Sequence, residues 1–222
     1  TEEAYLELTN MGDQPVDLSN VILAAAQSTE NFRTDTSRWN VQLLTNAPIL
    51  PPGESFVVIN YRTATADPTN VFTPLWYLDK ADYMLMYTLR NSTSGMRCSN
   101  GDDALGLFWD ADGDNLVEYA VDTLLDLVGF PGESKVFDVA GVTNASITHT
   151  FIRKANFTKG NAGNWESSAG VSAEDSEWIA IPYSPYRLGA MFTTVGNHGN
   201  TFSWDFSPKS GTVDDNGITM PW

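Results

Sequence analysis

The sequence predicts an all-β fold, either a sandwich or a barrel of antiparallel strands joined by long loops. Short stretches in which apolar and polar residues alternate recur along the 222 residues, as half-buried strands require. Clusters of Gly, Pro, Asn and Asp, the residues of tight turns, separate these stretches. No window longer than about ten residues keeps the apolar spacing of a capped amphipathic helix. Strands at such short spacings are typical of sandwiches and barrels.

The first half of the chain contains four predicted strands. Residues 4–8 alternate in polarity and stop at an Asn-Met-Gly-Asp turn, after which apolar character resumes at 16–23. A Pro-Pro-Gly-Glu turn precedes residues 55–60, which are rich in β-branched and aromatic side chains. The fourth strand is predicted at 83–89.

The second half begins with a predicted β-hairpin. Residues 104–109 and 116–121 are apolar runs on either side of an Asp/Gly/Asn cluster at 110–115. Residues 123–128 fit at most one or two turns of helix. Four later segments are also predicted to be strands: 134–139, 146–153, 177–181 and 201–206. Three long polar segments are predicted to be loops, where functional residues are commonly found: 27–48, 61–82 and 156–176.

The charge and composition limit the possible partners and the location. Asp and Glu number 28 against 12 Lys and Arg, which gives a formal charge of −16. Duplex nucleic acid and anionic membrane surfaces attract clustered basic side chains, so both are disfavoured as partners. The polarity comes mainly from Asn, Ser and Thr, a composition that favours an extracellular or cell-surface protein. The single cysteine, Cys98, excludes an intrachain disulfide.

An ordered series of short motifs resembles the lamin-tail domain of bacterial secreted proteins. The series is Tyr-Leu-Glu-Leu at 5–8, Val-Asp-Leu-Ser-Asn at 16–20, Leu-Pro-Pro-Gly-Glu at 50–54, Gly-Asp-Asp-Ala-Leu-Gly-Leu-Phe at 101–108, the segment 146–154 and Ser-Glu-Trp-Ile at 176–179. The resemblance implies an immunoglobulin-like β-sandwich over 1–189, followed by a C-terminal extension over 190–222. It also implies a non-catalytic adhesion, scaffolding or targeting module, and it carries over no catalytic residue.

Two departures from the family pattern suggest how the chain assembles. The family has a strand before its Tyr-Leu-Glu-Leu strand, and here only three residues precede it, so the edge at Tyr5, Leu6 and Leu8 is expected to be open. The extension holds a strand-like run with the apolar residues Phe202, Trp204 and Phe206. We expect this run to pair with the open edge, in its own chain or in a neighbouring copy. A chain whose first strand lies further upstream is the alternative.

The turn of the predicted hairpin is a candidate calcium site. Asp110, Asp112 and Asp114 place carboxylates at alternate positions, and Glu118 and Asp122 can add further ligands. Ca²⁺ takes about six to eight oxygen ligands, and crowded carboxylates repel one another without a cation. The loop lacks the Gly and the Glu that an EF-hand has at its sixth and twelfth positions. An acidic turn without bound metal is therefore the alternative, and no other cofactor is predicted.

No catalytic motif is present in the sequence. The two histidines, His149 and His198, have no partner at metal-ligand spacing. The adjacent Asp102 and Asp103 resemble an acid–base pair, but their position before an apolar run favours a turn. We therefore predict that the chain is not an enzyme.

Three tryptophans lie in polar segments: Trp39, Trp76 and Trp165. Each could bind a ligand such as a sugar ring or pack against the fold.

The predicted function is adhesion or assembly outside the cell, through a protein partner or by self-association. Two alternatives remain open: a carbohydrate-binding module with structural calcium, and an accessory domain of a secreted hydrolase such as a nuclease.

Overall fold

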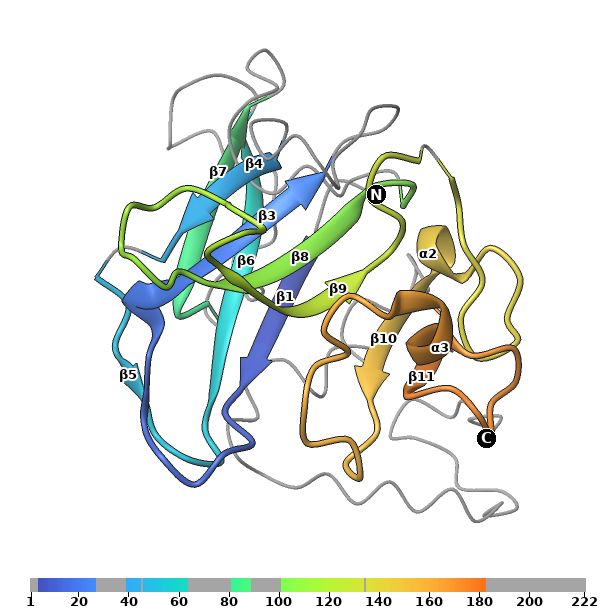
Figure 1. Cartoon of the computed structure of the whole chain (residues 1–222). Coiled ribbons are helices and arrows are strands. Elements are labelled where there is room, and N and C mark those ends of the chain that lie inside the picture. The colour runs from blue at the N-terminus through green and yellow to red at the C-terminus, as the bar shows by residue number, and fades with distance from the viewer. Residues whose placement is uncertain are drawn as a thin grey trace, which may run out of the picture.

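The computed structural model describes residues 4–26, 39–44, 46–63, 81–88, 101–133 and 135–182. Over these residues the fold is mainly β, with eleven strands and two short α-helices (Figure 1). The prediction of a β-rich fold is therefore confirmed. The extension 190–222, including the strand predicted at 201–206, lies outside the described residues.

One sheet contains three strands in the order β1–β6–β7, which are Ala4–Thr9, Ser55–Thr63 and Tyr83–Thr88. Strand β1 runs antiparallel to β6, whereas β7 runs parallel to it. The start of β7 is fixed by Asp82, whose carboxylate accepts the amide of Val57 at 2.8 Å while its own amide donates to the Val57 carbonyl at 2.9 Å. The strands predicted at 4–8, 55–60 and 83–89 are thus confirmed.

The second sheet contains four antiparallel strands in the order β4–β3–β8–β9. Their bounds are Trp39–Leu43, Val21–Ala26, Ala104–Trp109 and Thr123–Val128. All six residues of β3 are buried, because this strand has neighbours on both sides and is covered on both faces. A short ladder of β2 (Val16–Asp17) and β5 (Ile49–Leu50), with a 3-10 turn at Leu18–Asn20, leads into β3.

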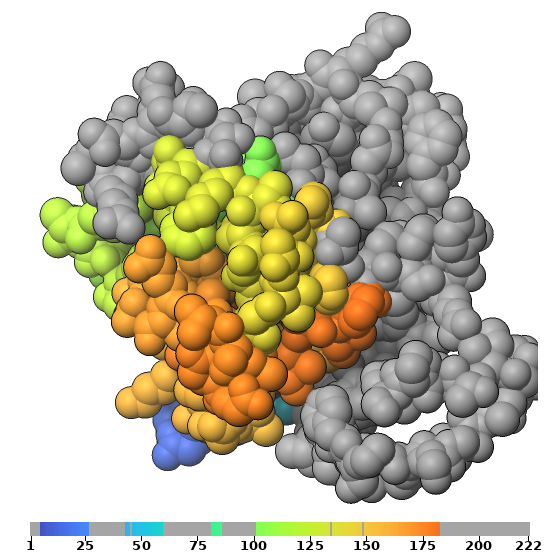
Figure 2. Space-filling model, turned by 90° about the vertical axis from the view of Figure 1, so that its right-hand side faces the viewer, coloured from blue at the N-terminus to red at the C-terminus, as the bar shows by residue number. Residues whose placement is uncertain are grey.

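The described residues of 130–182 form a separate layer over one face of the four-stranded sheet (Figure 1). Figure 2 shows the outer surface of this layer. The layer is built from the hairpin of β10 (His149–Arg153) and β11 (Trp178–Pro182), with the short helices α2 (Ala145–Thr148) and α3 (Trp165–Ala169). The strand predicted at 177–181 is confirmed by β11. The one predicted at 146–153 is confirmed only from residue 149, because the chain first makes one helical turn.

Four predictions of secondary structure are wrong in the four-stranded sheet and the segments that follow it. Residues 116–121 are not a strand, since the amides of Val121 and Asp122 both turn back to the Glu118 carbonyl, and the return strand is β9 instead. That strand occupies 123–128, where a helical turn was predicted. Strand β4 lies within the predicted loop 27–48. In the described part of the strand predicted at 134–139, residues 135–139, the only β pairing is an isolated bridge from Val139 to Val142.

Two main apolar clusters stabilise this arrangement. The first is filled from both sheets by side chains such as Leu23, Phe56 and Val58, with Leu6 and Leu107 packed against them. The second lies on the opposite face of the four-stranded sheet, where its side chains meet the C-terminal layer. Its buried members are Ile22, Ala24, Ala26, Ala104, Phe108, Val117, Leu127, Phe137, Val139, Ala145, Trp165 and Ala169. The four-stranded sheet is therefore the middle layer of the described fold.

Candidate functional site

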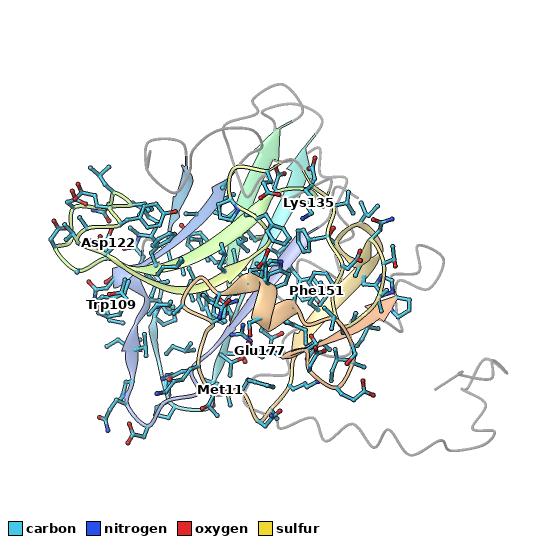
Figure 3. All side chains as sticks on the ribbon, turned by 45° about the vertical axis from the view of Figure 1, so that its right-hand side comes forward. Met11, Trp109, Asp122, Lys135, Phe151 and Glu177 are labelled. Carbon is cyan, nitrogen blue, oxygen red and sulfur yellow. The ribbon has the colours of Figure 1, made fainter. Side chains whose placement is uncertain are left out.

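The loop between β8 and β9, residues 110–122, is the candidate functional site and is called the acidic loop below. It contains five carboxylates and no basic residue. It projects from one end of the four-stranded sheet (Figure 1), and Asp122 at its base lies well away from Phe151 and Glu177 of the C-terminal layer (Figure 3). The predicted hairpin turn is thus present, but it is longer than expected because β9 starts late.

Two buried carboxylates hold the backbone of the acidic loop. Asp110, 4% exposed, accepts the amides of Gly113 at 2.8 Å and Asn115 at 3.0 Å. Asp122, 9% exposed, accepts the amides of Ala111 at 3.0 Å and Glu118 at 2.8 Å. A carboxylate that accepts two backbone amides is well compensated for its burial. Both aspartates therefore serve as internal supports for the loop.

The remaining carboxylates of the acidic loop face solvent and lie close together. The oxygens of Asp112, Asp114 and Glu118 form a group within 4.8 Å of one another, and a second such group joins Asp112 to Asp110 and Asp122. Asp114 also accepts the amide of Leu116 at 2.8 Å. The three aspartates of the predicted calcium site are thus brought together with both of the further ligands that the sequence suggested, Glu118 and Asp122.

Apolar side chains are exposed on the same loop. The exposed fraction is 57% for Leu116, 44% for Val121 and 36% for Tyr119. The ring of Tyr119 packs edge-on against Phe108 in the core, with 5.8 Å between the ring centroids. The loop thus combines negative charge with apolar surface, a combination suited to contact with another molecule.

A second polar cluster, which the sequence analysis missed, lies between β9 and the C-terminal layer. The Arg153 guanidinium donates to both oxygens of Asp126 at 2.7 and 2.9 Å and lies 3.2 Å from the Glu177 carboxylate. Ser168 donates to Glu177 at 2.7 Å and accepts from the Trp178 indole at 2.9 Å. The single guanidinium therefore offsets one of the two negative charges and bridges both carboxylates within the fold. The sequence contains no pattern that predicts this cluster, because its charged residues, Asp126, Arg153 and Glu177, lie far apart in the chain.

The other residues singled out from the sequence fall outside any assembled site in the described chain. Trp165 is 2% exposed and packs edge-on against Phe137, which agrees with the packing alternative and not with ligand contact. Trp39 begins β4, and Trp76 lies outside the described residues, as do His198 and Cys98. His149 begins β10, and burial lowers the pKa of its imidazole against an opposing hydrogen bond to the backbone of Ala145.

The predicted edge strand is described, but its predicted partner is not. Tyr5, Leu6 and Leu8 lie in β1, an outer strand of the three-stranded sheet. Leu6 and Leu8 pack against the core shared by both sheets, while Tyr5 packs against Val57 and Ile59 on the other face. Phe202, Trp204 and Phe206 lie beyond the last residue that the structure describes. Pairing between the extension and β1 therefore stays a prediction.

Comparison with known proteins finds no family model, curated protein or solved structure that matches this chain. Among the described residues, no helix is long and apolar enough to cross a membrane.

Proposed function

We propose that the chain is a non-catalytic adhesion or assembly module that acts outside the cell. In this proposal it is an immunoglobulin-like β-sandwich of the lamin-tail type, followed by an extension that pairs with a sheet edge of its own or a neighbouring copy. The observation that carries the proposal is the use of buried polar groups. In the described chain, the six buried polar or charged residues are hydrogen-bonded within the fold, whereas the buried Nε of Arg153 and Nε1 of Trp165 have no hydrogen-bond partner. The six residues are Asn10, Ser55, Asp110, Asp122, Ser168 and Ser176.

An enzyme site brings an acid, base or nucleophile together with a complementary group, such as a cation or an oxyanion donor, at one reacting atom. Here Asp110 and Asp122 are engaged by backbone amides, and Arg153 is engaged by Asp126 and Glu177. The groups that face outward on the acidic loop are apolar side chains and carboxylates, and the loop itself holds no basic residue. This distribution favours binding over catalysis.

The sandwich interpretation is supported by the apolar core that the two sheets share. Alternate residues of β6, Phe56 and Val58, pack with Val21 and Leu23 from β3 in one cluster. Such a core between two sheets is the defining feature of a β-sandwich. The parallel pairing of β6 with β7 differs from a purely antiparallel sheet, as mixed edges commonly do. Strands β1 and β7 are the outer strands of the three-stranded sheet among the described residues.

Self-association of the full chain is the test of this proposal. Sedimentation velocity over a wide concentration range should show reversible oligomers. Replacing Phe202 and Trp204 by aspartate should shift the midpoint of association to about tenfold higher concentration or more, because charge on an inserted strand opposes its burial. Replacing Lys209 by alanine, also in the extension, is the matched control and should leave association unchanged. A strictly monomeric full-length chain would contradict the assembly role.

Calcium binding by the acidic loop is a second candidate function. It is favoured by the grouping of carboxylate oxygens from Asp112, Asp114 and Glu118. Oxygen ligands of this kind suit Ca²⁺, and a bound cation would relieve their mutual repulsion. In the proposed module, calcium would stiffen the loop that presents Leu116 and Tyr119.

Calorimetric titration of the full chain with Ca²⁺ at low salt should give a saturable signal and a rise in melting temperature. Replacing Asp112 by asparagine, which removes a charge shared by both carboxylate groups, should weaken the affinity about tenfold or more. Replacing the distant, exposed Asp13 by asparagine should have no effect. If neither heat nor a change in melting temperature is seen, the loop is an acidic turn alone.

A further inference from the structure

The outer edge of β9 is covered by a short loop of the same chain, residues 159–163. The amide of Ala162 donates to the Leu125 carbonyl at 3.1 Å, as a residue of a neighbouring strand would. The side chain of Asn161 then bonds both backbone groups of Leu127, accepting from its amide at 3.0 Å and donating to its carbonyl at 2.7 Å. A carboxamide has the same donor and acceptor pair as a peptide group, so Asn161 substitutes for a strand residue.

Further contacts hold this loop in place. The amide of Asn161 donates to the Asp126 carboxylate at 3.0 Å, and Arg153, which binds that carboxylate, also donates to the Lys159 carbonyl at 3.3 Å. A side chain at Gly160 would collide with the carbonyl oxygen of Leu125, so only glycine allows the loop to approach β9 this closely. The loop is thus attached to β9 by several hydrogen bonds and by a close steric fit at Gly160.

We infer that residues 159–163 are a guard that closes the β9 edge against strand addition by a second copy of this chain. The inference rests on the proposed assembly through sheet edges and deepens it, because it assigns one edge that does not take part. Unpaired strand edges attract other strands unless they are covered. With β9 closed, pairing is left to other edges, and copies cannot join at random. Removal of the guard would let the β9 edges of two copies meet in antiparallel register.

The guard can be tested in the full chain with Asn161→Ala, which removes the two side-chain bonds to Leu127 and the bond that this side chain accepts from the Gly163 amide, and leaves the backbone intact. Hydrogen exchange measured by mass spectrometry should show the Leu127 amide, which then keeps only its 3.1 Å bond to the Asp126 carboxylate, exchanging about tenfold faster or more than in the wild type. Sedimentation should show additional dimer relative to the wild type at equal concentration. Asn164→Ala is the matched control, because Asn164 begins α3 without a side-chain capping bond. It should match the wild type in both measurements.

Gly160→Val is a second variant, in which the added side chain should displace the whole loop and give a larger effect of the same kind. If this variant does not fold, Asn161→Ala still decides. The inference is overturned if Asn161→Ala exchanges as slowly as the wild type. It is also overturned if the edge opens but no additional dimer forms.

The test of the guard and the test of the proposed function can be distinguished by their results. The guard concerns association that appears only in the variants, whereas the proposed function concerns wild-type association that depends on Phe202 and Trp204. A monomeric wild type with a dimeric Asn161→Ala variant would support the guard and contradict assembly through the extension. The reverse pattern would support assembly and contradict the guard.

Discussion

Replacing Arg153 by alanine is expected to lower the free energy of unfolding by about 3–5 kcal/mol. The change leaves two partly buried carboxylates, Asp126 and Glu177, without their counter-charge, and breaking a buried pair from one side is strongly destabilising. The side chains of Arg153, Asp126 and Glu177 are only 17%, 23% and 20% exposed, so solvent compensates little. Chemical denaturation of the full chain, with the transition followed by tryptophan fluorescence, measures the loss.

Arg153→Met separates charge from packing in this prediction. The Arg153 guanidinium lies 4.3 Å from the centre of the Trp178 ring, and methionine keeps an apolar stem over that ring while removing the charge. The methionine variant should therefore recover part of the loss, but not all of it. Lys135→Ala is the control, because its ion pair with Glu133 is 3.9 Å long and more than half exposed, and pairs of this kind contribute less than about 1 kcal/mol. A loss equally small for Arg153→Ala would show that the network does not hold the layers together.

The Arg153 network also connects the core to the guard loop. Asp126 bonds both the Arg153 guanidinium and the amide of Asn161. Loss of Arg153 should therefore speed hydrogen exchange at Leu127 as well as lower stability, whereas Asn161→Ala should change exchange with a smaller loss of stability. The two variants thus distinguish a general weakening of the layer from specific opening of the β9 edge.

The sequence predicts strands well where one face of the strand is buried and the other is not. Residues 104–109 alternate between buried and half-buried, and β8 occupies these six positions. The strand at residues 123–128 was not predicted, for the opposite reason. Their run Thr-Leu-Leu-Asp-Leu-Val does not alternate, because a bulge lies between the β8 partners Leu107 and Phe108 and the C-terminal layer covers what would be an exposed face.

The candidate site was predictable only in its local part. Asp110, Asp112, Asp114 and Glu118 are close in sequence, so a turn brings them together. Asp122 was also a candidate ligand from the sequence, but it joins the group through the fold-back of residues 118–122 and not at the end of the strand expected at 116–121. Trp165 stands in a polar stretch, yet the C-terminal layer buries it. Contacts that depend on which layers pack together, such as Arg153 with Asp126, have no local pattern that would reveal them.

Replacing Phe108 by alanine is expected to lower the free energy of unfolding by about 3–5 kcal/mol, the usual loss when a fully buried aromatic side chain is truncated. Phe108 is 0% exposed, in the strand between β3 and β9, and belongs to the cluster that joins the four-stranded sheet to the C-terminal layer. Phe108→Leu, which keeps most of the volume, should lose less than about 2 kcal/mol. Met84→Ala, at a side chain that is 54% exposed, should be nearly neutral in the same denaturation experiment.

Phe108 also supports the acidic loop, because the ring of Tyr119 packs on it. The leucine variant should therefore remain folded but present a looser loop, with faster hydrogen exchange at the amides of Glu118 and Val121 than in the wild type. If the loop binds calcium, its affinity should fall in Phe108→Leu although no ligand has been changed. Unchanged exchange in the loop would show that Asp110 and Asp122 position it without help from the core.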